Sequence, residues 1–303
     1  MNSCPVCSSN ETFLYMKGIF DSETTSVIEC KNCGLQFLDP MMSDAEEEEY
    51  YRNYYNSQKS RHYKTFTLKD IQNNALSHYE EYKDVYNDLI KDKRSILEIG
   101  SGTGGFLKFV KKYSPASEIT SVEKSESNLD FLNDKKENAF DNIEFYQDVN
   151  SIGSTKNFDL IVAFGVLEHV RKSSLFLNSI VPLLNGNSSL LAFNIPNKRN
   201  PLIDIYSIEE FKKFTYMLQH CYTFTEKSLE ILGKKVGLEI EKFNYIQVWS
   251  LDNHLSWLKN KKPKDFSSFT NILSKETINN YNNDLISRKI TDLMMVVYKK
   301  TQV

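Results

Sequence analysis

The chain has 303 residues, enough for about two domains, and 40% of its residues are hydrophobic, which is enough for a sizeable core. Lysine and arginine number 37 against 40 aspartates and glutamates, a net charge of −3, so the composition argues against a nucleic-acid partner. The sequence has no run of 18 apolar residues, and its first residues lack the pattern of a secretory signal. We therefore expect a cytoplasmic protein without a membrane span.

Four of the five cysteines form two C-x-x-C pairs near the N-terminus, namely Cys4 with Cys7 and Cys30 with Cys33. Two such turns bring four thiolates to the spacing of a tetrahedral zinc shell. Between the pairs, residues 11–16 and 26–29 have the pattern of short strands. We expect residues 1–40 to form a zinc ribbon. Its Zn²⁺ would be structural, because four thiolates leave no open position for catalysis.

Two other uses of these cysteines fit less well. A redox C-x-x-C pair usually begins a helix that follows a strand, whereas the first pair here begins four residues from the N-terminus. Two disulfides would suit an exported domain, and the sequence gives no sign of export. We therefore expect the four cysteines to bind a structural zinc ion.

Residues 41–92 are predicted to form a helical arm. Ser43 is a suitable N-cap for a helix with an acidic first turn, and residues 66–92 carry apolar side chains near helical spacing. The simplest interpretation of the acidic run is a solvated helix face. The tyrosines of residues 50–55 leave a second interpretation open, in which the arm is a lid over a site formed later in the chain.

Four of the eleven glycines lie within six positions, at Gly100, Gly102, Gly104 and Gly105. Residues 95–99 have the pattern of a strand before this turn, and residues 106–113 that of an amphipathic helix after it. A strand, a glycine turn and a helix form the first unit of a doubly wound α/β sheet, in which bare backbone closely approaches a ligand. A second strand, 118–122, ends at Glu123, whose carboxylate could accept both hydroxyls of a ribose.

The cofactor of this glycine turn has two interpretations. Gly100, Gly102 and Gly105 match G-x-G-x-x-G, so a dinucleotide oxidoreductase has to be weighed. S-adenosylmethionine is favoured by the acidic Glu98 in the first strand and by Asp148 directly after a third strand. A fourth strand at 158–163, its loop at 164–170 and the long segment that precedes the glycines favour it too.

As an ordered set, these motifs resemble the class I S-adenosylmethionine-dependent methyltransferases over about residues 90–240. The resemblance implies a doubly wound, Rossmann-like sheet of seven strands in residues 93–303, with an antiparallel edge strand at 290–298. In such a fold Glu98 and the glycines line the methionine end of the cofactor, Glu123 binds the ribose and Asp148 contacts the adenine. The complete set of implied cofactor residues is Glu98, Gly100, Ser101, Gly102, Gly104, Glu123, Lys124, Gln147, Asp148, Val149, Phe164 and Gly165.

The two ends of the chain resemble the zinc-bearing methyltransferases of bacterial sugar and polysaccharide pathways. The likeness rests on residues 33–40 with the following Tyr50 and Tyr51, and on residues 249–258. C-methylation of a keto-deoxysugar is an alternative, but only about 60 residues follow Lys242, too few for the C-terminal domain of such enzymes. We expect O- or N-methylation of a sugar-derived or similarly polar small molecule.

Other classes of function remain as alternatives. For an RNA methyltransferase with a zinc ribbon, the near-neutral charge is unfavourable, and loop 194–197 lacks the Asn-Pro-Pro-Tyr pattern used on base amines. A non-enzymatic alternative is a scaffold whose ribbon binds a partner and whose fold binds S-adenosylmethionine without using it. The intact glycine turn argues against such a decayed site.

A hydroxyl acceptor needs a base to remove its proton, and histidine suits that task. Three of the five histidines are candidates: His169 after the fourth strand, His220 after the fifth, and His254 near the C-terminal end. Some O-methyltransferases hold Mg²⁺ with a Glu-x-x-Glu-His run at this loop. Here Gly165 replaces the first carboxylate, so we expect no catalytic metal.

Overall fold

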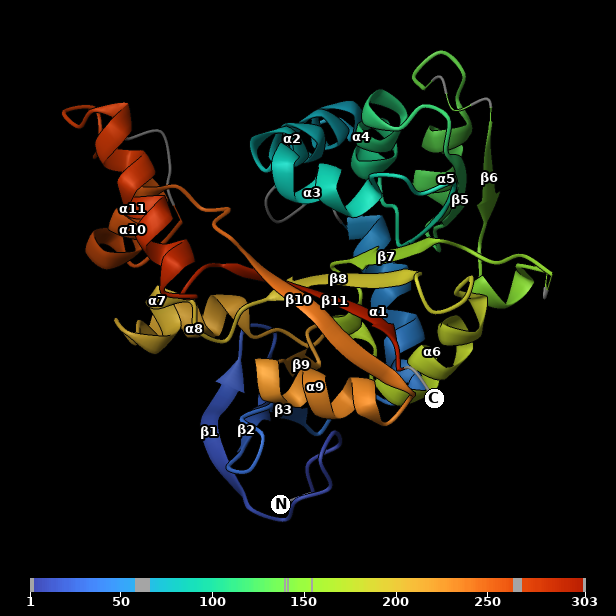
Figure 1. Cartoon of the computed structure of the whole chain (residues 1–303). Helices are drawn as coiled ribbons and strands as arrows, with labels where there is room; N and C mark the ends of the chain where they lie inside the picture. The colour runs from blue at the N-terminus through green and yellow to red at the C-terminus, as the bar shows by residue number, and fades with distance from the viewer. Residues whose placement is uncertain are drawn as a thin grey trace.

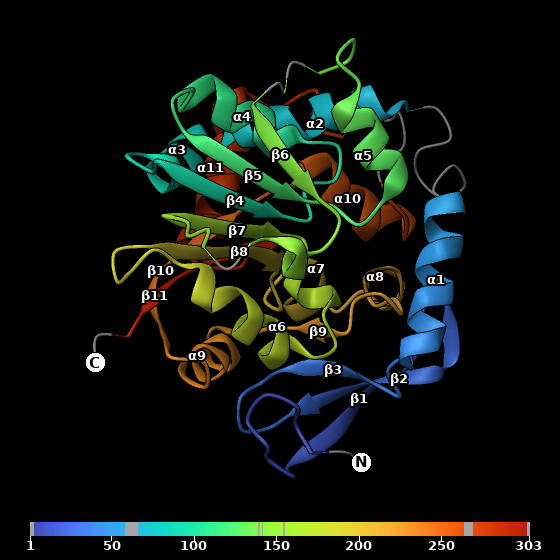
Figure 2. The ribbon, with the colours of Figure 1, turned by 90° about the vertical axis from the view of Figure 1, so that its right-hand side faces the viewer.

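Two β-sheets organise the computed structural model, which describes residues 3–57, 66–138, 140, 142–153, 155–263 and 269–301 (Figures 1 and 2). The larger sheet contains β4 (Ser95–Ile99), β5 (Glu118–Val122), β6 (Ile143–Tyr146), β7 (Leu160–Phe164), β8 (Leu190–Pro196), β10 (Leu238–Ile246) and β11 (Leu293–Lys300). Their order is β10–β11–β8–β7–β4–β5–β6. The predicted doubly wound sheet of seven strands is confirmed.

The last strand is antiparallel, as expected, but the expected position at the sheet edge is wrong. β11 pairs with both β8 and β10, so β10 is the edge strand. The burial patterns explain this order. β11 has five consecutive buried residues, from Met294 to Tyr298, and an uninterrupted apolar run needs cover on both faces. In β10, apolar residues are interspersed with charged and polar residues, and most of them are half-buried. This pattern suits an edge strand.

Helices cover both faces of the large sheet. One face packs against α2 (Leu68–Glu81), α3 (Lys83–Ile90), α4 (Gly105–Tyr113) and α5 (Glu126–Asn133). The other face packs against α6 (Ser173–Ile180), α9 (Glu226–Lys234) and the cysteine-bearing N-terminal region (Figure 2). The segment expected to be helical at 66–92 forms two helices, α2 and α3. The first of them, α2, begins at a capping box formed by Thr67 and Asp70.

The smaller sheet contains β1 (Thr12–Ile19), β2 (Ser22–Cys30), β3 (Gln36–Asp39) and β9 (Tyr222–Thr223), all antiparallel. We call residues 3–40 the ribbon. Its predicted strands are present and longer than expected. The fourth strand, β9, comes from a part of the chain about 180 residues further on, and it places the ribbon directly below the large sheet (Figure 1). The buried cysteines and Phe37 share one core with Tyr222 and Phe224.

The remaining helices lie at the sides of the large sheet. α1 (Asp44–Ser57) runs upward from the ribbon beside the carboxyl ends of the parallel strands (Figure 2). α7 (Pro201–Asp204) and α8 (Glu209–Thr215) follow β8, and α10 (Leu251–Asn260) and α11 (Lys275–Ser287) follow β10. These four helices gather together (Figure 1), with Trp257 of α10 packed on Phe211 of α8. Within the described residues, no helix is both long enough and apolar enough to span a membrane.

The contact between α2 and α4 depends on a residue without a side chain. A Cβ on Gly105 would lie 2.5 Å from the Cβ of Ala75, so Gly105→Ala has to push the two helices apart. We expect this substitution to lower the free energy of unfolding by about 1–3 kcal/mol, measured by urea denaturation. Gly153→Ala is the control, because a Cβ there would meet only the Thr155 hydroxyl, at 3.9 Å. Equal losses in the two variants would contradict this account.

Candidate functional site

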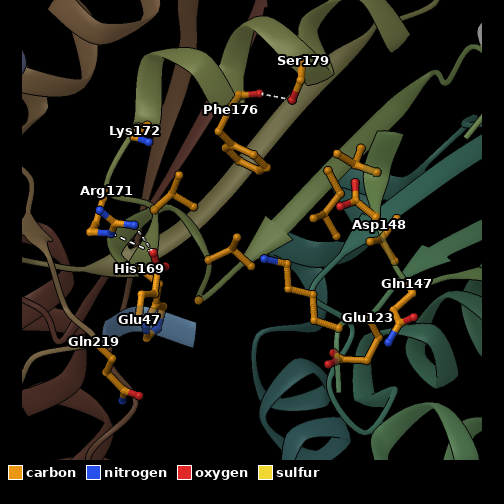
Figure 3. A pocket seen from close by; sticks show the side chains of 18 of the residues that line it. Glu47, Glu123, Gln147, Asp148, His169, Arg171, Lys172, Phe176, Ser179 and Gln219 are labelled. Atoms are coloured by element: carbon orange, nitrogen blue, oxygen red, sulfur yellow. Dashed lines mark hydrogen bonds and ion pairs between the residues drawn. The ribbon is translucent and has the colours of Figure 1, made fainter. Parts of the chain in front are cut away.

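A cavity of about 930 Å³ lies at the carboxyl ends of the parallel strands, beside the point where the chain order reverses between β4 and β7. In doubly wound sheets this is where ligands bind. The predicted cofactor residues that line the cavity are Gly100, Gly102, Glu123, Lys124, Gln147, Asp148, Val149 and Gly165. Figure 3 shows two sides to it, with Glu123, Gln147 and Asp148 on one side and His169, Arg171 and Glu47 on the other.

The glycine turn supplies bare backbone to the first side. Gly100, Gly102 and Gly104 all have positive φ, a conformation that favours glycine. A Cβ on Gly100 would lie 2.6 Å from Val166, whereas a Cβ on Gly102 would meet nothing within 4 Å. Gly102 therefore presents its main chain to open space in the cavity wall, and a side chain there would fill that space.

Glu123 connects this turn to the end of β5. One carboxylate oxygen accepts a hydrogen bond from the Gly102 backbone amide at 2.7 Å, and the other accepts from the Ser125 amide at 2.8 Å. Burial nevertheless raises the pKa of Glu123 above its ordinary value, and these hydrogen bonds work against that rise. The carboxylate is thus fixed in place at the edge of the cavity. On the same side of the cavity, Asp148 accepts two hydrogen bonds from Asn150, at 2.7 and 2.8 Å.

Four of the predicted cofactor residues lie outside the cavity lining, at Glu98, Ser101, Gly104 and Phe164. Glu98 is buried in β4, directly before the turn, and burial followed by the charge of Glu123 raises its pKa to about 8. Its Oε2 atom has no hydrogen-bond partner among the described residues. Phe164 packs edge-on against Phe106 in an aromatic cluster behind the strands. Gly104 precedes the first residue of α4, and Ser101 accepts a hydrogen bond from Ser121.

His169 and His220 meet on the second side of the cavity. Their ring centroids are 4.8 Å apart, and the His220 Nδ1 atom lies 3.2 Å from the Thr215 carbonyl oxygen. Burial, and then the neighbouring His220, lower the pKa of His169 to about 3. Burial also lowers the pKa of His220 below its ordinary value. Both rings are therefore neutral at neutral pH, and a neutral imidazole has a lone pair that can accept a proton.

The third candidate, His254, lies elsewhere. It is buried in α10, with Nδ1 2.6 Å from the Tyr281 hydroxyl and Nε2 3.5 Å from Asp292. Asp292 also accepts hydrogen bonds from the backbone amides of Val248 and Trp249. The structure thus places His254 in a polar network that joins α11 to the residues just after β10 and just before β11. His254 does not line the cavity.

The first turn of α1 completes the second side, which the sequence analysis did not anticipate. Arg171 is only 14% exposed and forms ion pairs with Asp44 and Glu47 (Figure 3). Lys172 lies 3.3 Å from Asp44. The acidic run is therefore more than a solvated face. These partners are more than 120 residues apart, so no local pattern could have revealed the pairing. Of the tyrosines proposed as a lid, those in residues 51–57 have side chains outside the described part.

The four N-terminal cysteines lie together, with all four sulfur atoms within 4.8 Å of one another. The sulfur of Cys4 is 3.6 Å from that of Cys33, and the sulfur of Cys7 is 3.5 Å from that of Cys30. A tetrahedron of zinc–sulfur bonds about 2.3 Å long has edges close to these distances. The arrangement of the donors therefore fits a four-thiolate metal site.

Comparisons with known proteins agree with this architecture. Residues 75–242 match a family described as "Methyltransferase domain". The chain is 30% identical over 93 residues to a pavine N-methyltransferase of Thalictrum flavum subsp. glaucum, covering 30% of this chain and 26% of that protein. It is 23% identical over 111 residues to an (S)-tetrahydroprotoberberine N-methyltransferase of Eschscholzia californica, covering 36% and 32%. The matched part thus spans about a third or less of each relative's length.

A solved structure from Haloferax volcanii shares the fold at low sequence identity. A Haloferax volcanii complex between the Trm112 methyltransferase activator and a putative methyltransferase has a TM-score of 0.53 at 10% identity, covering 86% of this chain and 99% of that one. The plantazolicin methyltransferase BpumL in complex with SAH has a TM-score of 0.47 at 19% identity, covering 86% and 92%. The family match covers more than half of the residues and includes the strands and loops that line the cavity. The chain therefore belongs to the methyltransferase-domain family.

Proposed function

We propose that this protein transfers a methyl group from S-adenosylmethionine to an oxygen or nitrogen atom of a polar small molecule, a sugar or sugar nucleotide of polysaccharide or related biosynthesis. The observation that carries the proposal is the two-sided cavity. Its first side, the cofactor side, presents the bare Gly102 backbone and the fixed Glu123 carboxylate. Its second side, the acceptor side, presents two neutral histidines.

The residues of the cofactor side suit S-adenosylmethionine. Glu123 lines the cavity, and its carboxylate can accept hydrogen bonds from ribose hydroxyls. Asp148 and Gln147 stand where polar groups of an adenine could be recognised. Directly before the turn, the buried Oε2 of Glu98 has no hydrogen-bond partner among the described residues, which leaves it available to a ligand amine. When bound, the cofactor supplies an electrophilic methyl group on a sulfonium.

On the acceptor side, His169 is the proposed base. Since burial keeps its ring neutral, the ring can accept the proton of an acceptor hydroxyl as the new oxygen–carbon bond forms. A nitrogen acceptor reacts as the neutral amine, through its own lone pair. The adjacent His220 limits the orientations open to that ring. Alignment of the acceptor with the methyl group then accounts for much of the rate.

The lining of the acceptor side supports a polar substrate. Glu47, Arg171, Lys172 and Gln219 supply hydrogen-bond donors and acceptors there, which suits a molecule rich in hydroxyl or amino groups. The curated relatives are N-methyltransferases, which supports nitrogen as one possible acceptor atom. We further propose that Cys4, Cys7, Cys30 and Cys33 hold a structural Zn²⁺.

Cofactor binding can be tested without knowing the acceptor. Calorimetric titration with S-adenosylhomocysteine should show micromolar binding at one site, and NAD should give no heat. Glu123→Gln should bind S-adenosylhomocysteine at least about tenfold more weakly, because hydrogen bonds to a charged carboxylate contribute about 1.5–3 kcal/mol. Glu126→Gln, an exposed carboxylate three residues away, should bind like the wild type. A folded protein that does not bind S-adenosylhomocysteine would overturn the proposal.

The role of His169 can be tested once a screen of sugars and sugar nucleotides has found an acceptor. His169→Asn should lower kcat by about 100-fold or more, the usual effect of removing a general base. Its affinity for S-adenosylhomocysteine should stay close to wild type, because His169 lies across the cavity from Glu123. His254→Asn serves as the comparison and should lower stability more than kcat. Loss of both kcat and cofactor affinity in His169→Asn would indicate a structural role.

The zinc site predicts a fixed metal content. Protein produced with ample zinc should contain one zinc ion per chain by mass spectrometry of the metals, and Cys30→Ser should lose most of it. Cys221→Ser is the control, because Cys221 is buried outside the four-cysteine cluster and should leave the zinc content unchanged. Zinc content far below one ion per chain in the wild type would refute the assignment.

A further inference from the structure

The acceptor side contains a loop that the ribbon holds at several points. We define the histidine loop as residues 215–221, which include the cavity residues Gln219 and His220. The Phe20 amide donates to the Tyr216 carbonyl oxygen at 3.0 Å, and the Leu38 amide donates to the Cys221 carbonyl oxygen at 3.1 Å. Directly after the loop, β9 pairs with β3. The position of His220 is therefore determined largely by a part of the chain that precedes it by about 180 residues.

Asp21 is a ribbon residue whose side chain contacts both the histidine loop and α1. It lies in the turn between β1 and β2 and is half-buried. Its Oδ1 atom accepts a hydrogen bond from the Leu218 backbone amide at 2.9 Å. Its Oδ2 atom accepts a hydrogen bond from the Tyr50 hydroxyl, in α1, at 3.2 Å. One ribbon carboxylate thus contacts both the histidine loop and the helix whose first turn lines the cavity.

Contacts from the end of the loop and from β9 continue to the residues that follow β7. The Tyr222 hydroxyl donates to the Arg171 carbonyl oxygen at 2.5 Å, and the Cys221 sulfur lies 3.7 Å from the His169 carbonyl oxygen. Arg171 in turn pairs with Asp44 and Glu47 of α1. Contacts therefore run from the histidine loop and β9 through residues 169–171 to α1, and Asp21 closes the circuit because it contacts both the loop and α1.

We propose that Asp21 is a positioning residue, which holds the histidine loop and α1 in the arrangement that forms the acceptor side. The inference rests on the proposed function for its assignment of that side to the acceptor. The cofactor side is made by the turn after β4 and by the ends of β5 and β6, and Gly102 and Glu123 fix each other there. Loss of the Asp21 carboxylate should therefore disturb acceptor recognition while cofactor binding stays intact.

A set of variants separates this role from general support of the ribbon. Asp21→Ala removes both hydrogen bonds. Asp21→Asn keeps an oxygen for the Leu218 amide and offers its own amide to the Tyr50 oxygen, so it should rescue the effect. Glu23→Ala is the matched control, since Glu23 is a carboxylate in the same hairpin with an exposed side chain.

Hydrogen exchange followed by mass spectrometry gives a readout that is independent of activity. In Asp21→Ala, the peptide that contains Leu218 should exchange about tenfold faster, as expected for loss of one hydrogen bond to a charged group. The Asn variant and Glu23→Ala should exchange like the wild type. Once an acceptor is found, its KM in Asp21→Ala should rise by a similar factor, with the affinity for S-adenosylhomocysteine unchanged.

Unchanged exchange at Leu218 in Asp21→Ala would overturn the proposal. So would faster exchange throughout the ribbon with a parallel loss of S-adenosylhomocysteine affinity, because that pattern reports general destabilisation. Failure of the wild type to bind S-adenosylhomocysteine would count against the proposed function instead, and the exchange at Leu218 would still show whether Asp21 holds the loop.

Discussion

The pairing of β3 with β9 is the constraint on which the rest of the structure depends. The two strands pair in register at Gln36 with Thr223 and at Phe37 with Tyr222. These two pairs lie between the four-cysteine cluster and the cavity. On the β3 side, the cysteine cluster lies three residues away, at Cys33; on the β9 side, His220 lies two residues away. The Thr225 hydroxyl reinforces the junction by donating to the Cys33 carbonyl oxygen at 2.6 Å. Order in the cysteine cluster and order in the cavity are therefore physically linked.

The features that could be predicted from the sequence are those that a short stretch of chain specifies by itself. The glycine turn is one, because positive φ at Gly100, Gly102 and Gly104 leaves few alternatives to glycine. The apolar strands before and after it are others, because strands buried on both faces appear as continuous apolar runs. The close approach of the four cysteines also follows from local spacing, since each C-x-x-C turn places two sulfur atoms side by side.

The features that escaped prediction depend on contacts between distant segments. A strand of two residues, such as β9, is too short to show an alternating pattern. The ion pairs from Arg171 to Asp44 and Glu47 join charges that look like ordinary surface residues in the sequence. His169 and His220 could each be suggested as a base, but only the fold brings their rings to 4.8 Å. The same fold removes His254 to a separate buried network.

The two sides of the cavity differ in how many distant segments form them, and this affects how each side can change by substitution. The cofactor side is built mainly from the ends of three neighbouring strands, and Glu123 closes it through the amide of Gly102. Three distant segments form the acceptor side: the first turn of α1, residues 169–172 and the histidine loop. A substitution in any one of them alters the shape or charge around the acceptor without touching the Gly102–Glu123 hydrogen bond. Under the proposed function, selectivity for the acceptor can therefore vary while the binding of the methyl donor is preserved.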